Sequence, residues 1–387
     1  SFIHPWSRYF TAVLFSIAIL GALYWWVNDP SKILPVVTAV LIVACPCSLL
    51  LSATFTFGNM LRIFGKNKLY LKNASVIESL AKVQHIVFDK TGTITQTGNA
   101  LVQFNGAALT SAEEEWVRSA AMQSSHTLSS SLAGHLGTDL FTEVPVMQHF
   151  SETAGKGLVA EMEGAKVELG AAGFMNVKQP EEVLTGSCVH VKINDAYKGF
   201  YNIGNQYRAG IKKLVTQLQD KRFNLHVLSG DNDAEIMNLR DFFGTQSPMR
   251  FNVTPQQKLS YIEQLQKSGQ KILMVGDGLN DAGALMQADI GIAVSDDAAR
   301  FSPACDAIMD GAALNKLHSF IAYAKAGKQI VMACFILSIL YNVVGVSFAV
   351  QGKLSPIVAA ILMPASSISI VLLVTLLTSW VAKRKGL

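Results

Sequence analysis

An aspartate that directly follows a short apolar run is the residue best placed for covalent chemistry. Ile86-Val87-Phe88 has the composition of a buried strand, and Asp89-Lys90-Thr91-Gly92-Thr93 follows it at once. A carboxylate at a strand end, followed by a tight glycine turn, is exposed beside backbone N–H groups. Such an aspartate can attack a phosphoryl group and form an acyl-phosphate when a cation neutralises the developing charge. The pattern predicts that Asp89 is a phosphate-accepting nucleophile.

A second strand end offers the cation site. Residues 275–281 read Val-Gly-Asp-Gly-Leu-Asn-Asp, which places Asp277, Asn280 and Asp281 just after an apolar run. Mg²⁺ prefers oxygen ligands and keeps waters and substrate phosphates around it. The carboxylates of Asp89 and Asp277 therefore predict a Mg²⁺ site.

Two further segments complete the predicted site. Ser229-Gly230-Asp231-Asn232 ends another apolar run and offers a hydroxyl and N–H donors to a phosphate. Lys258, three residues after Pro255, carries a positive charge that can stabilise a transferring phosphoryl group. Each segment alone could be an ordinary polar loop, but the four together, in this order, indicate phosphoryl transfer.

Short apolar runs that alternate with amphipathic segments must position these residues. The predicted strands are Ile86–Phe88, Leu225–Leu228, Ile272–Val275 and Ile290–Val294. Amphipathic segments at 209–219 and 256–267 precede two of them. This alternation predicts a parallel sheet with helices on both faces, where ligands gather at the carboxyl ends of the strands. Residues 99–198 are Gly-rich with short alternating segments such as Val189–Ile193, and we expect an inserted second domain there.

The chain also contains four segments without Asp, Glu, Lys or Arg, at residues 9–27, 33–57, 329–352 and 354–382. An apolar helix of about 20 residues spans the hydrocarbon core of a bilayer. The segments come in two pairs with short connectors, so each pair predicts a helical hairpin across a membrane. Only 16% of the residues are charged, against ~25% in soluble proteins, which argues against a uniformly soluble enzyme.

The distribution of charge predicts the orientation. Lys and Arg cluster at residues 62–72 and 383–385, after the second and fourth uncharged segments, and such clusters favour the cytoplasmic side. We therefore expect the intervening body and both termini in the cytoplasm. Residues 62–328 hold 26 basic and 27 acidic residues, so the net charge of +4 arises outside them and implies no nucleic-acid partner. The five Cys show no secreted disulfide pattern, as expected in a reducing compartment.

A proline between two cysteines marks the second uncharged segment, in Ala44-Cys45-Pro46-Cys47-Ser48. Pro46 lacks an N–H and interrupts a helix, and interrupted membrane helices line cavities where ions bind. Thiolates select soft ions such as Cu(I). The third segment adds the polar pair Tyr341-Asn342, and the fourth adds Met363-Pro364-Ala365-Ser366-Ser367. These groups outline a predicted path for a soft metal ion.

The sequence resembles the P-type ATPases. Their signature is D-K-T-G-T followed by G-D-G-x-N-D, which here begins at Asp89 and at Gly276, and their phosphorylation domain has the haloacid-dehalogenase fold. The resemblance implies that ATP phosphorylates Asp89. It implies Mg²⁺ binding by Asp89, Asp277 and the carbonyl of Thr91. The further residues implied in catalysis are Lys90, Ser229, Lys258, Asn280 and Asp281.

This resemblance implies a multidomain membrane protein with transmembrane α-helices, a haloacid-dehalogenase-like α/β phosphorylation domain and an inserted α+β nucleotide-binding domain. The expected division is 1–72 and 321–387 for the membrane helices with their extensions, 73–98 with 199–320 for phosphorylation, and 99–198 for nucleotide binding. Family members usually have Thr in place of Ser229 and Asp in place of Asn205. At the second position, the neutral Asn205 cannot supply the charge for the local salt-bridge or hinge role that the resemblance implies there.

Residues 99–198 resemble the nucleotide-binding domain of the heavy-metal branch. The marks are Ser125-His126-Thr127-Leu128-Ser129, where the family has Pro in place of Thr127, and Gly155-Lys156-Gly157. The resemblance implies that His126 stacks against or hydrogen-bonds adenine, and that the glycines let the backbone approach the nucleotide. The residues implied in ATP binding are His126, Glu152, Gly155, Gly157, Gly170, Gly230 and Asp231.

The membrane residues resemble the Cu(I)-exporting members, which have C-P-C, then Y-N, then M-x-x-S-S. Zn²⁺/Cd²⁺ members tend to have a Lys and an Asp in the last two spans, and neither charge occurs here. The resemblance implies Cu(I) as the transported ion. The implied ligands are Cys45, Cys47 and Met363, with Tyr341, Asn342 and Ser366 as orienting or transient contacts. It further implies a bacterial inner-membrane protein, surrounded by lipid, that receives copper from a cytoplasmic copper chaperone.

A complete pump of this branch has an actuator domain with a T-G-E motif, and membrane helices before the first one seen here. Neither occurs in this sequence, so we expect an N-terminally truncated pump that binds nucleotide without completing a transport cycle.

Two alternatives stay open. A Zn²⁺/Cd²⁺-transporting P-type ATPase would differ in the ion alone. A membrane-anchored dehalogenase-type phosphatase would use Asp89 on a small phosphate ester. Such enzymes usually have an acid where this chain has Thr91, and a threonine is a poor general acid for the leaving group.

Overall fold

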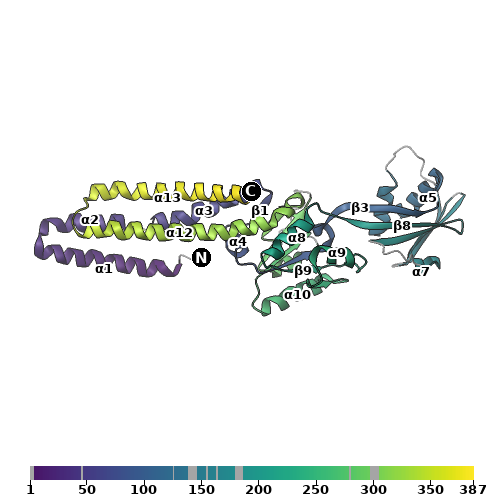
Figure 1. Cartoon of the computed structure of the whole chain (residues 1–387), viewed down its shortest axis with the longest axis horizontal. Coiled ribbons are helices and arrows are strands. Elements are labelled where there is room, and N and C mark those ends of the chain that lie inside the picture. The colour runs from purple at the N-terminus through teal and green to yellow at the C-terminus, as the bar shows by residue number, and fades with distance from the viewer. Residues whose placement is uncertain are drawn as a thin grey trace.

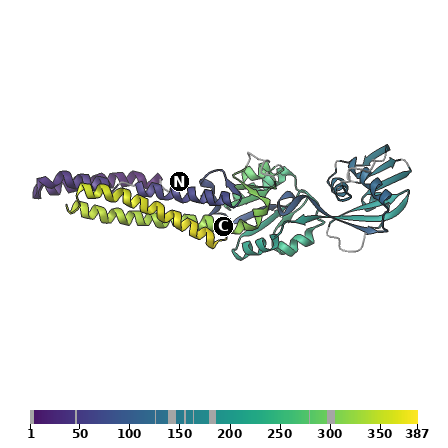
Figure 2. The same cartoon turned by 90° about the horizontal axis from the view of Figure 1, so that it is seen from above.

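The computed structural model describes residues 4–44, 47–124, 126–137, 146–153, 156–162, 164–178, 186–278, 280–296 and 305–387. For residues 4–11, 47–50, 97–100 and 127 it describes the backbone alone. The molecule is elongated. A bundle of helices forms one end, an α/β body lies in the middle, and a second sheet forms the other end (Figures 1 and 2).

The bundle contains the apolar segments of the chain. Its helices are α1 (His4–Asn28), α2 (Ile33–Val43), α3 (Cys47–Lys66), α12 (Leu317–Val350) and α13 (Pro356–Arg384). In the described part of the chain, two helices are long and apolar enough to cross a membrane: residues 311–350, where the turn η3 (Gly311–Lys316) leads into α12, and α13. Shorter apolar helices cover Ala12–Asn28 and Pro30–Val43. The predicted segment 33–57 is divided between α2 and α3, and Cys45 and Pro46 between them lie outside the described residues.

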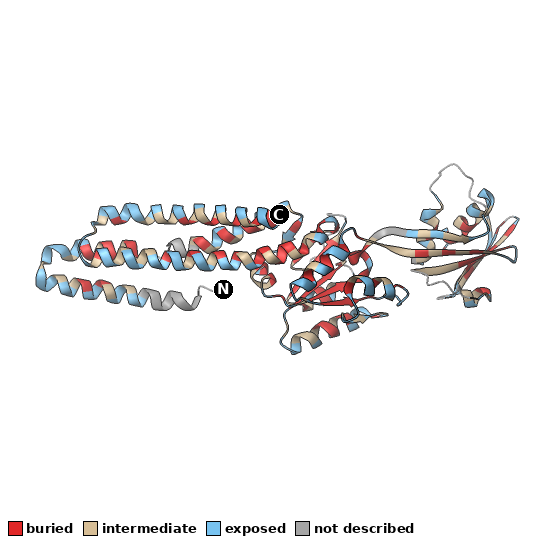
Figure 3. Ribbon diagram, in the orientation of Figure 1, coloured by how far each residue is buried: buried red, intermediate tan, exposed pale blue. Residues whose placement is uncertain are grey.

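Large apolar side chains cover the outside of the bundle, whereas the strands of the α/β body are buried (Figure 3). Leu20, Ile361 and Leu376 expose 65%, 64% and 68% of their surface. Contiguous apolar surface of this kind marks contact with lipid or protein. Inside the bundle, Ala39 of α2 and Ala359 of α13 are fully buried in one cluster, so small residues allow the helices to pack closely.

The α/β body is built on a sheet whose described strands follow the order β1-β13-β12-β11-β2-β9-β10. Its strands are β1 (Leu69–Leu71), β2 (His85–Asp89), β9 (Asn224–Leu228), β10 (Met249–Arg250), β11 (Ile272–Gly276), β12 (Ile290–Ser295) and β13 (Ala307–Asp310). β1 is antiparallel to β13, and the other neighbours are parallel.

Helices cover both faces of this sheet. They are α4 (Ser75–Leu80), α8 (Ile211–Asp220), α9 (Ile236–Phe243), α10 (Pro255–Lys267) and α11 (Ala282–Gln287). Ile86 and Phe88 pack in the cluster that includes α8 and α9, whereas Val87 packs with α10 and α11. Strand side chains alternate between faces, so a continuous apolar run suits a strand that is covered on both sides.

The second sheet is antiparallel, with its described strands in the order β3-β8-β7-β6-β5-β4. The strands are β3 (Thr95–Gly106), β4 (Met147–Thr153), β5 (Gly157–Met162), β6 (Ala165–Gly170), β7 (Ser187–Ile193) and β8 (Ala196–Tyr207), with helices α5 (Ser111–Met122), α6 (Thr127–His135) and α7 (Ala172–Met175). The long strands β3 and β8 run from the α/β body into this sheet (Figure 1). The sheet therefore extends a few residues beyond 99–198 at both ends, because these strands continue pairing across the connection.

Candidate active site

The carboxyl ends of three adjacent strands bring the predicted chemistry together. β2 lies between β9 and β11. Asp89 is the last residue of β2, Ser229 follows β9, and Asp277 follows β11. Parallel strands end at the same edge of a sheet, so residues up to 188 positions apart in the sequence are neighbours there.

Lys258 forms an ion pair with the predicted nucleophile, Asp89. It comes from the first turn of α10, which Thr254 caps by accepting a hydrogen bond from the N–H of Gln257 at 3.3 Å. Its Nζ lies 2.5 Å from Asp89 Oδ1 and 2.7 Å from Asp281 Oδ1. All three side chains are at most 6% exposed. This buried cluster joins one cation to two carboxylates.

The electrostatics of this cluster affect the nucleophile. Burial and the neighbouring Asp281 carboxylate raise the pKa of Asp89 to about 7, against the opposing effect of Lys258. Burial likewise raises the pKa of Asp281. Burial alone would lower the pKa of Lys258, but the two carboxylates raise it above its usual value. An additional cation beside Asp89 would favour its ionised, nucleophilic form.

The predicted phosphorylation loop is η2 (Lys90–Ile94), and hydrogen bonds join it to the loop after β9. Thr91 Oγ1 donates a hydrogen bond to Asp231 Oδ2 at 2.6 Å, and Lys90 Nζ lies 3.0 Å from the same oxygen. Ser229 Oγ accepts a hydrogen bond from the N–H of Asp231 at 3.1 Å. Burial would raise the pKa of Asp231, but the hydrogen bond from Thr91 and the charge of Lys90 lower it. The structure therefore places Asp231 in contact with Lys90 and Thr91 of η2.

The segment after β11 folds back on itself. Asn280 donates from its backbone N–H to Asp277 Oδ1 at 3.1 Å, and from its side chain to Oδ2 at 2.8 Å. Gly278 has φ +84°, in the left-handed region where glycine avoids the steric penalty of a side chain. These contacts fix the Asp277 carboxylate at the strand edge.

Two buried residues hold the phosphorylation loop although no motif marks them. Arg208, just after β8, donates to the carbonyl of Thr93 at 2.8 Å and to that of Gly92 at 3.1 Å, and pairs with both oxygens of Asp296. Glu235 lies 3.1 Å from the Nζ of Lys90. In the sequence each is a single charged residue near a strand or helix, and its role depends on contacts across more than 100 residues.

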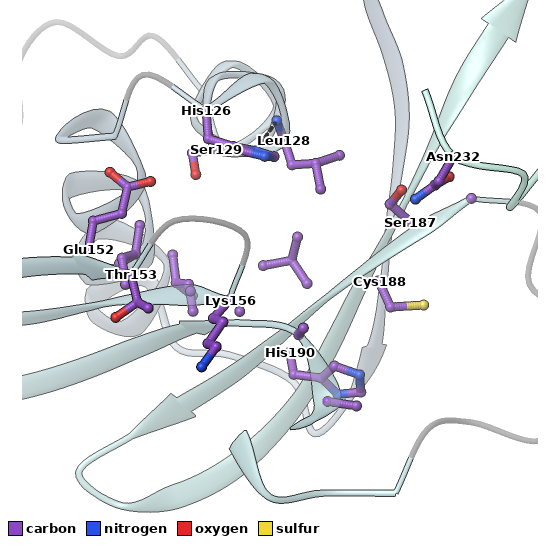
Figure 4. A pocket seen from close by; sticks show the side chains of 18 of the residues that line it. His126, Leu128, Ser129, Glu152, Thr153, Lys156, Ser187, Cys188, His190 and Asn232 are labelled. Carbon is purple, nitrogen blue, oxygen red and sulfur yellow. Dashed lines mark hydrogen bonds between the residues drawn. The ribbon is translucent and has the colours of Figure 1, made fainter. Parts of the chain in front are cut away.

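A cavity of about 410 Å³ lies between the second sheet and the loop after β9 (Figure 4). This is a volume typical of small-ligand sites. Of the residues predicted to bind nucleotide, the lining includes His126, Glu152, Gly157 and Gly170. Asn232 lines it from the α/β body, one position beyond Asp231. The lining also includes three residues that were not predicted to bind nucleotide: Lys156, Cys188 and His190. The predicted Gly155 lies outside the described residues.

Local hydrogen bonds orient the polar residues of this cavity. His126 is the N-cap of α6, and its Nδ1 accepts a hydrogen bond from the N–H of Leu128 at 3.2 Å. Figure 4 shows the two residues side by side. Glu152 Oε1 accepts from the hydroxyl of Ser124 at 2.8 Å. These hydrogen bonds hold His126 and Glu152 in the cavity wall.

Two glycines let the strands beside the cavity approach each other. Gly157 and Gly170 are paired across β5 and β6. A Cβ on Gly170 would lie 2.6 Å from the carbonyl oxygen of Lys156 and 2.8 Å from the ring of Phe174, which is closer than real contacts allow. Close strand packing therefore requires glycine at these positions, whether or not a nucleotide also needs the space.

In the bundle, the predicted metal-path residues of α12 and α13 lie at one level. Tyr341 Oη donates to the carbonyl of Leu362 at 3.0 Å, next to Met363. The Ser366 hydroxyl donates to the carbonyl of Met363 at 2.7 Å. Asn342 follows Tyr341 and is half-buried. Cys45 and the side chain of Cys47 lie outside the described part, and the described residues hold no group of three or more His, Cys, Asp or Glu placed for a metal ion.

Comparison with known proteins places this site in a family. The haloacid dehalogenase-like hydrolase family model matches residues 83–289, which contain Asp89, Lys258 and Asp277. The chain belongs to this family. The expected α/β phosphorylation fold is therefore confirmed.

Several similar curated proteins are named as metal-transporting P-type ATPases, which confirms the resemblance drawn from the motifs. The copper-exporting P-type ATPase of Staphylococcus saprophyticus is 28% identical over 385 residues, covering 94% of this chain and 47% of the relative. The cadmium/zinc-transporting ATPase HMA2 of Arabidopsis thaliana is 28% identical over 309 residues, covering 76% and 32%. The chain thus spans about half the length of the copper relative it matches.

A solved structure supports the fold of the whole chain. The crystal structure of a zinc-transporting PIB-type ATPase in an E2.Pi state superposes with a TM-score of 0.78 at 21% identity, over 99% of this chain and 64% of that one. The chain therefore shares the fold of the matching part of that structure.

Proposed function

We propose that this chain accepts the γ-phosphoryl group of ATP on Asp89, as the energy-transducing part of a pump that moves Cu(I) across a membrane. The observation that carries the phosphorylation step is the buried contact of Lys258 with both Asp89 and Asp281, at the carboxyl edge of β2 and β11. We assign nucleotide binding to residues 99–198 and phosphorylation to 73–98 with 199–320.

In the proposed reaction an Asp89 carboxylate oxygen bonds to the γ-phosphorus while the bond from that phosphorus to the β–γ bridging oxygen breaks, and ADP leaves. Lys258 stabilises the negative charge on the transferring group, because it is buried and therefore weakly screened. Thr91 and Lys90 hold the loop through Asp231, so the nucleophile stays aligned.

The donor set fits the Mg²⁺ that the family implies. Asp281 Oδ2 is buried and has no hydrogen-bond partner in the described structure, so this carboxylate edge has an unsatisfied oxygen acceptor. Mg²⁺ binds through one or two carboxylates together with waters and phosphates, and needs no cage of protein ligands. Asp89, Asp277 and the carbonyl of Thr91 would hold it, and it would supply positive charge to the phosphate oxygens.

The cargo proposal rests on the bundle. The hydrogen bond from Tyr341 to Leu362 supports a joint site, because it puts the polar pair of α12 beside Met363 of α13. Thioether and thiolate ligands favour Cu(I), which supports Cys45, Cys47 and Met363 as its ligands. The copper-named relative supports the same ion, while the cadmium/zinc relative favours testing Zn²⁺ as the alternative. A cytoplasmic copper chaperone as donor and the bacterial inner membrane as location belong to the same proposal.

Acid-stable phosphoenzyme formed from radiolabelled ATP tests the proposal. We expect Cu(I) to change its level in the wild type, and the Asp89→Asn variant to abolish the label because an amide is not a nucleophile here. Asp241→Asn is the matched control, because Asp241 is 64% exposed on α9 and forms an ion pair with the exposed Lys212 on the surface. A response to Zn²⁺ without one to Cu(I) would overturn the ion, and label retained in Asp89→Asn would overturn the nucleophile.

A further inference from the structure

A buried carboxylate connects three elements that the proposed reaction must keep together. Glu235 precedes α9, and its side chain is 4% exposed. Such a charge is costly to bury unless it is paired and hydrogen-bonded. Its partners therefore indicate why it is there.

The first partner is the phosphorylation loop. Glu235 Oε2 lies 3.1 Å from the Nζ of Lys90, directly after the nucleophile, and Lys90 is itself 3% exposed. The other carboxylate on Lys90, Asp231, is 47% exposed and also accepts the hydrogen bond of Thr91. Glu235 is thus the buried counterion of Lys90.

The second partner is the strand that leads into the second sheet. Asn205 of β8 donates its backbone N–H to Glu235 Oε1 and its side-chain amide to Oε2, both at 2.9 Å. Tyr207 donates its hydroxyl to Oε2 at 3.4 Å. β8 is one of the two long strands that run from the α/β body into the second sheet (Figure 1).

We propose that Glu235 is a positioning residue that fixes Lys90 on the phosphorylation loop and joins that loop to β8, the connection to the nucleotide-binding sheet. This inference rests on the proposed phosphorylation of Asp89.

The charge in this contact lies on Glu235, whereas its partner Asn205 is neutral. Lys90 Nζ and the Asn205 amide contact the same oxygen, so they are at most about 6 Å apart. A carboxylate at position 205 can therefore replace Glu235 as the counterion of Lys90.

This geometry predicts that combining two substitutions restores the reaction rate that each one alone reduces. Glu235→Gln leaves Lys90 without its buried counterion, and Asn205→Asp places two carboxylates in contact, which disfavours ionisation of both. We expect each single variant to slow phosphoenzyme formation at saturating ATP by about tenfold or more, and the double variant to recover to within about threefold of wild type. The ATP concentration for half-maximal rate should change by less than about twofold, because neither residue lines the cavity.

The assay compares initial rates of acid-stable labelling in wild type, the two single variants, the double variant and Asp241→Asn. Losses that multiply in the double variant, or a Glu235→Gln rate equal to wild type, overturn the inference. Absence of label in the wild type instead contradicts the proposed function. Thermal unfolding midpoints accompany each rate, and Asn205→Asp, which retains Glu235, tests the same contact if Glu235→Gln does not fold.

Discussion

At the scale of single residues, burial decides what the charged groups of the α/β body do. Lys258 contacts two carboxylates in a site where all three side chains are nearly inaccessible to water. Removing one partner of such a cluster leaves uncompensated charge, whereas in water the same contacts would contribute little. The strength of the interactions among Asp89, Lys258 and Asp281 therefore depends on their burial.

A second buried group predicts how stability depends on pH. His226 of β9 is 5% exposed, with its ring nitrogens 3.0 Å from His85 Nδ1 and 2.8 Å from the Tyr261 hydroxyl. Burial and the neighbouring His85 lower the pKa of His226 to about 4. The unfolded state, with a pKa of about 6.5, binds the proton first, so stability is full above pH 6.5 and is lost as the pH falls towards 4.

We expect the free energy of unfolding to fall by on the order of 2–3 kcal/mol between pH 7 and pH 4 through His226. His226→Gln keeps a hydrogen-bonding side chain without the titration, and should show a shallower pH dependence in denaturant unfolding at pH 5, 6 and 7. An identical slope in wild type and variant would show that His226 does not contribute.

At the scale of elements, the paired strands β5 and β6 shape the wall of the nucleotide cavity. Gly157 and Gly170 face each other, and a side chain on Gly170 would meet the backbone at Lys156 and the ring of Phe174. Separation of the strands would displace the cavity lining while leaving the strand edge at Asp89 untouched.

We expect Gly170→Val to weaken ATP binding about tenfold or more, with a smaller effect on phosphoenzyme formation at saturating ATP. Titration with a fluorescent nucleotide measures the first and labelling from ATP the second. Gly164→Ala, in an open turn of the same sheet, is the control for loss of a glycine, although its φ of +81° adds backbone strain of its own. Unchanged nucleotide affinity in Gly170→Val would contradict the role of this wall.

At the scale of the whole molecule, two chain segments join the bundle to the α/β body. α3 leads into β1, and η3 leads into α12. They are held together by Lys68–Asp310 at 2.7 Å and by Lys316, which donates to Asn67 at 3.0 Å. Phe64 packs against Tyr323 with ring centroids 5.3 Å apart. A change at the predicted metal path could therefore be transmitted through packed contacts to the sheet that carries Asp89.

This connection predicts that a bundle residue alters the metal response of a distant nucleophile. Met363→Leu removes a soft ligand while conserving volume. We expect it to raise the Cu(I) concentration needed for half-maximal change in labelling at Asp89 by about tenfold. Met332→Leu is the matched control, because the Met332 side chain on α12 is 43% exposed. Equal shifts in the two variants would argue against Met363 as a ligand.

The strand-end motifs alone predicted the family, the nucleophile and the parallel sheet, because Asp89 and Asp277 each follow an apolar run that local sequence defines. The uncharged segments likewise predicted apolar helices, since their length and composition are local properties. The boundaries of the second sheet were less predictable, because the long strands β3 and β8 continue their pairing past any change in composition.

What the sequence by itself determined is therefore which groups are available for the proposed chemistry: an aspartate at a strand end, further carboxylates, a lysine, and sulfur side chains in apolar segments. The tertiary structure alone decided which groups pair. Arg208 donates a hydrogen bond to Thr93 across 115 positions, and Glu235 accepts one from Asn205. These pairings depend on strand order and burial, which bring distant side chains within 3 Å and which no local pattern records.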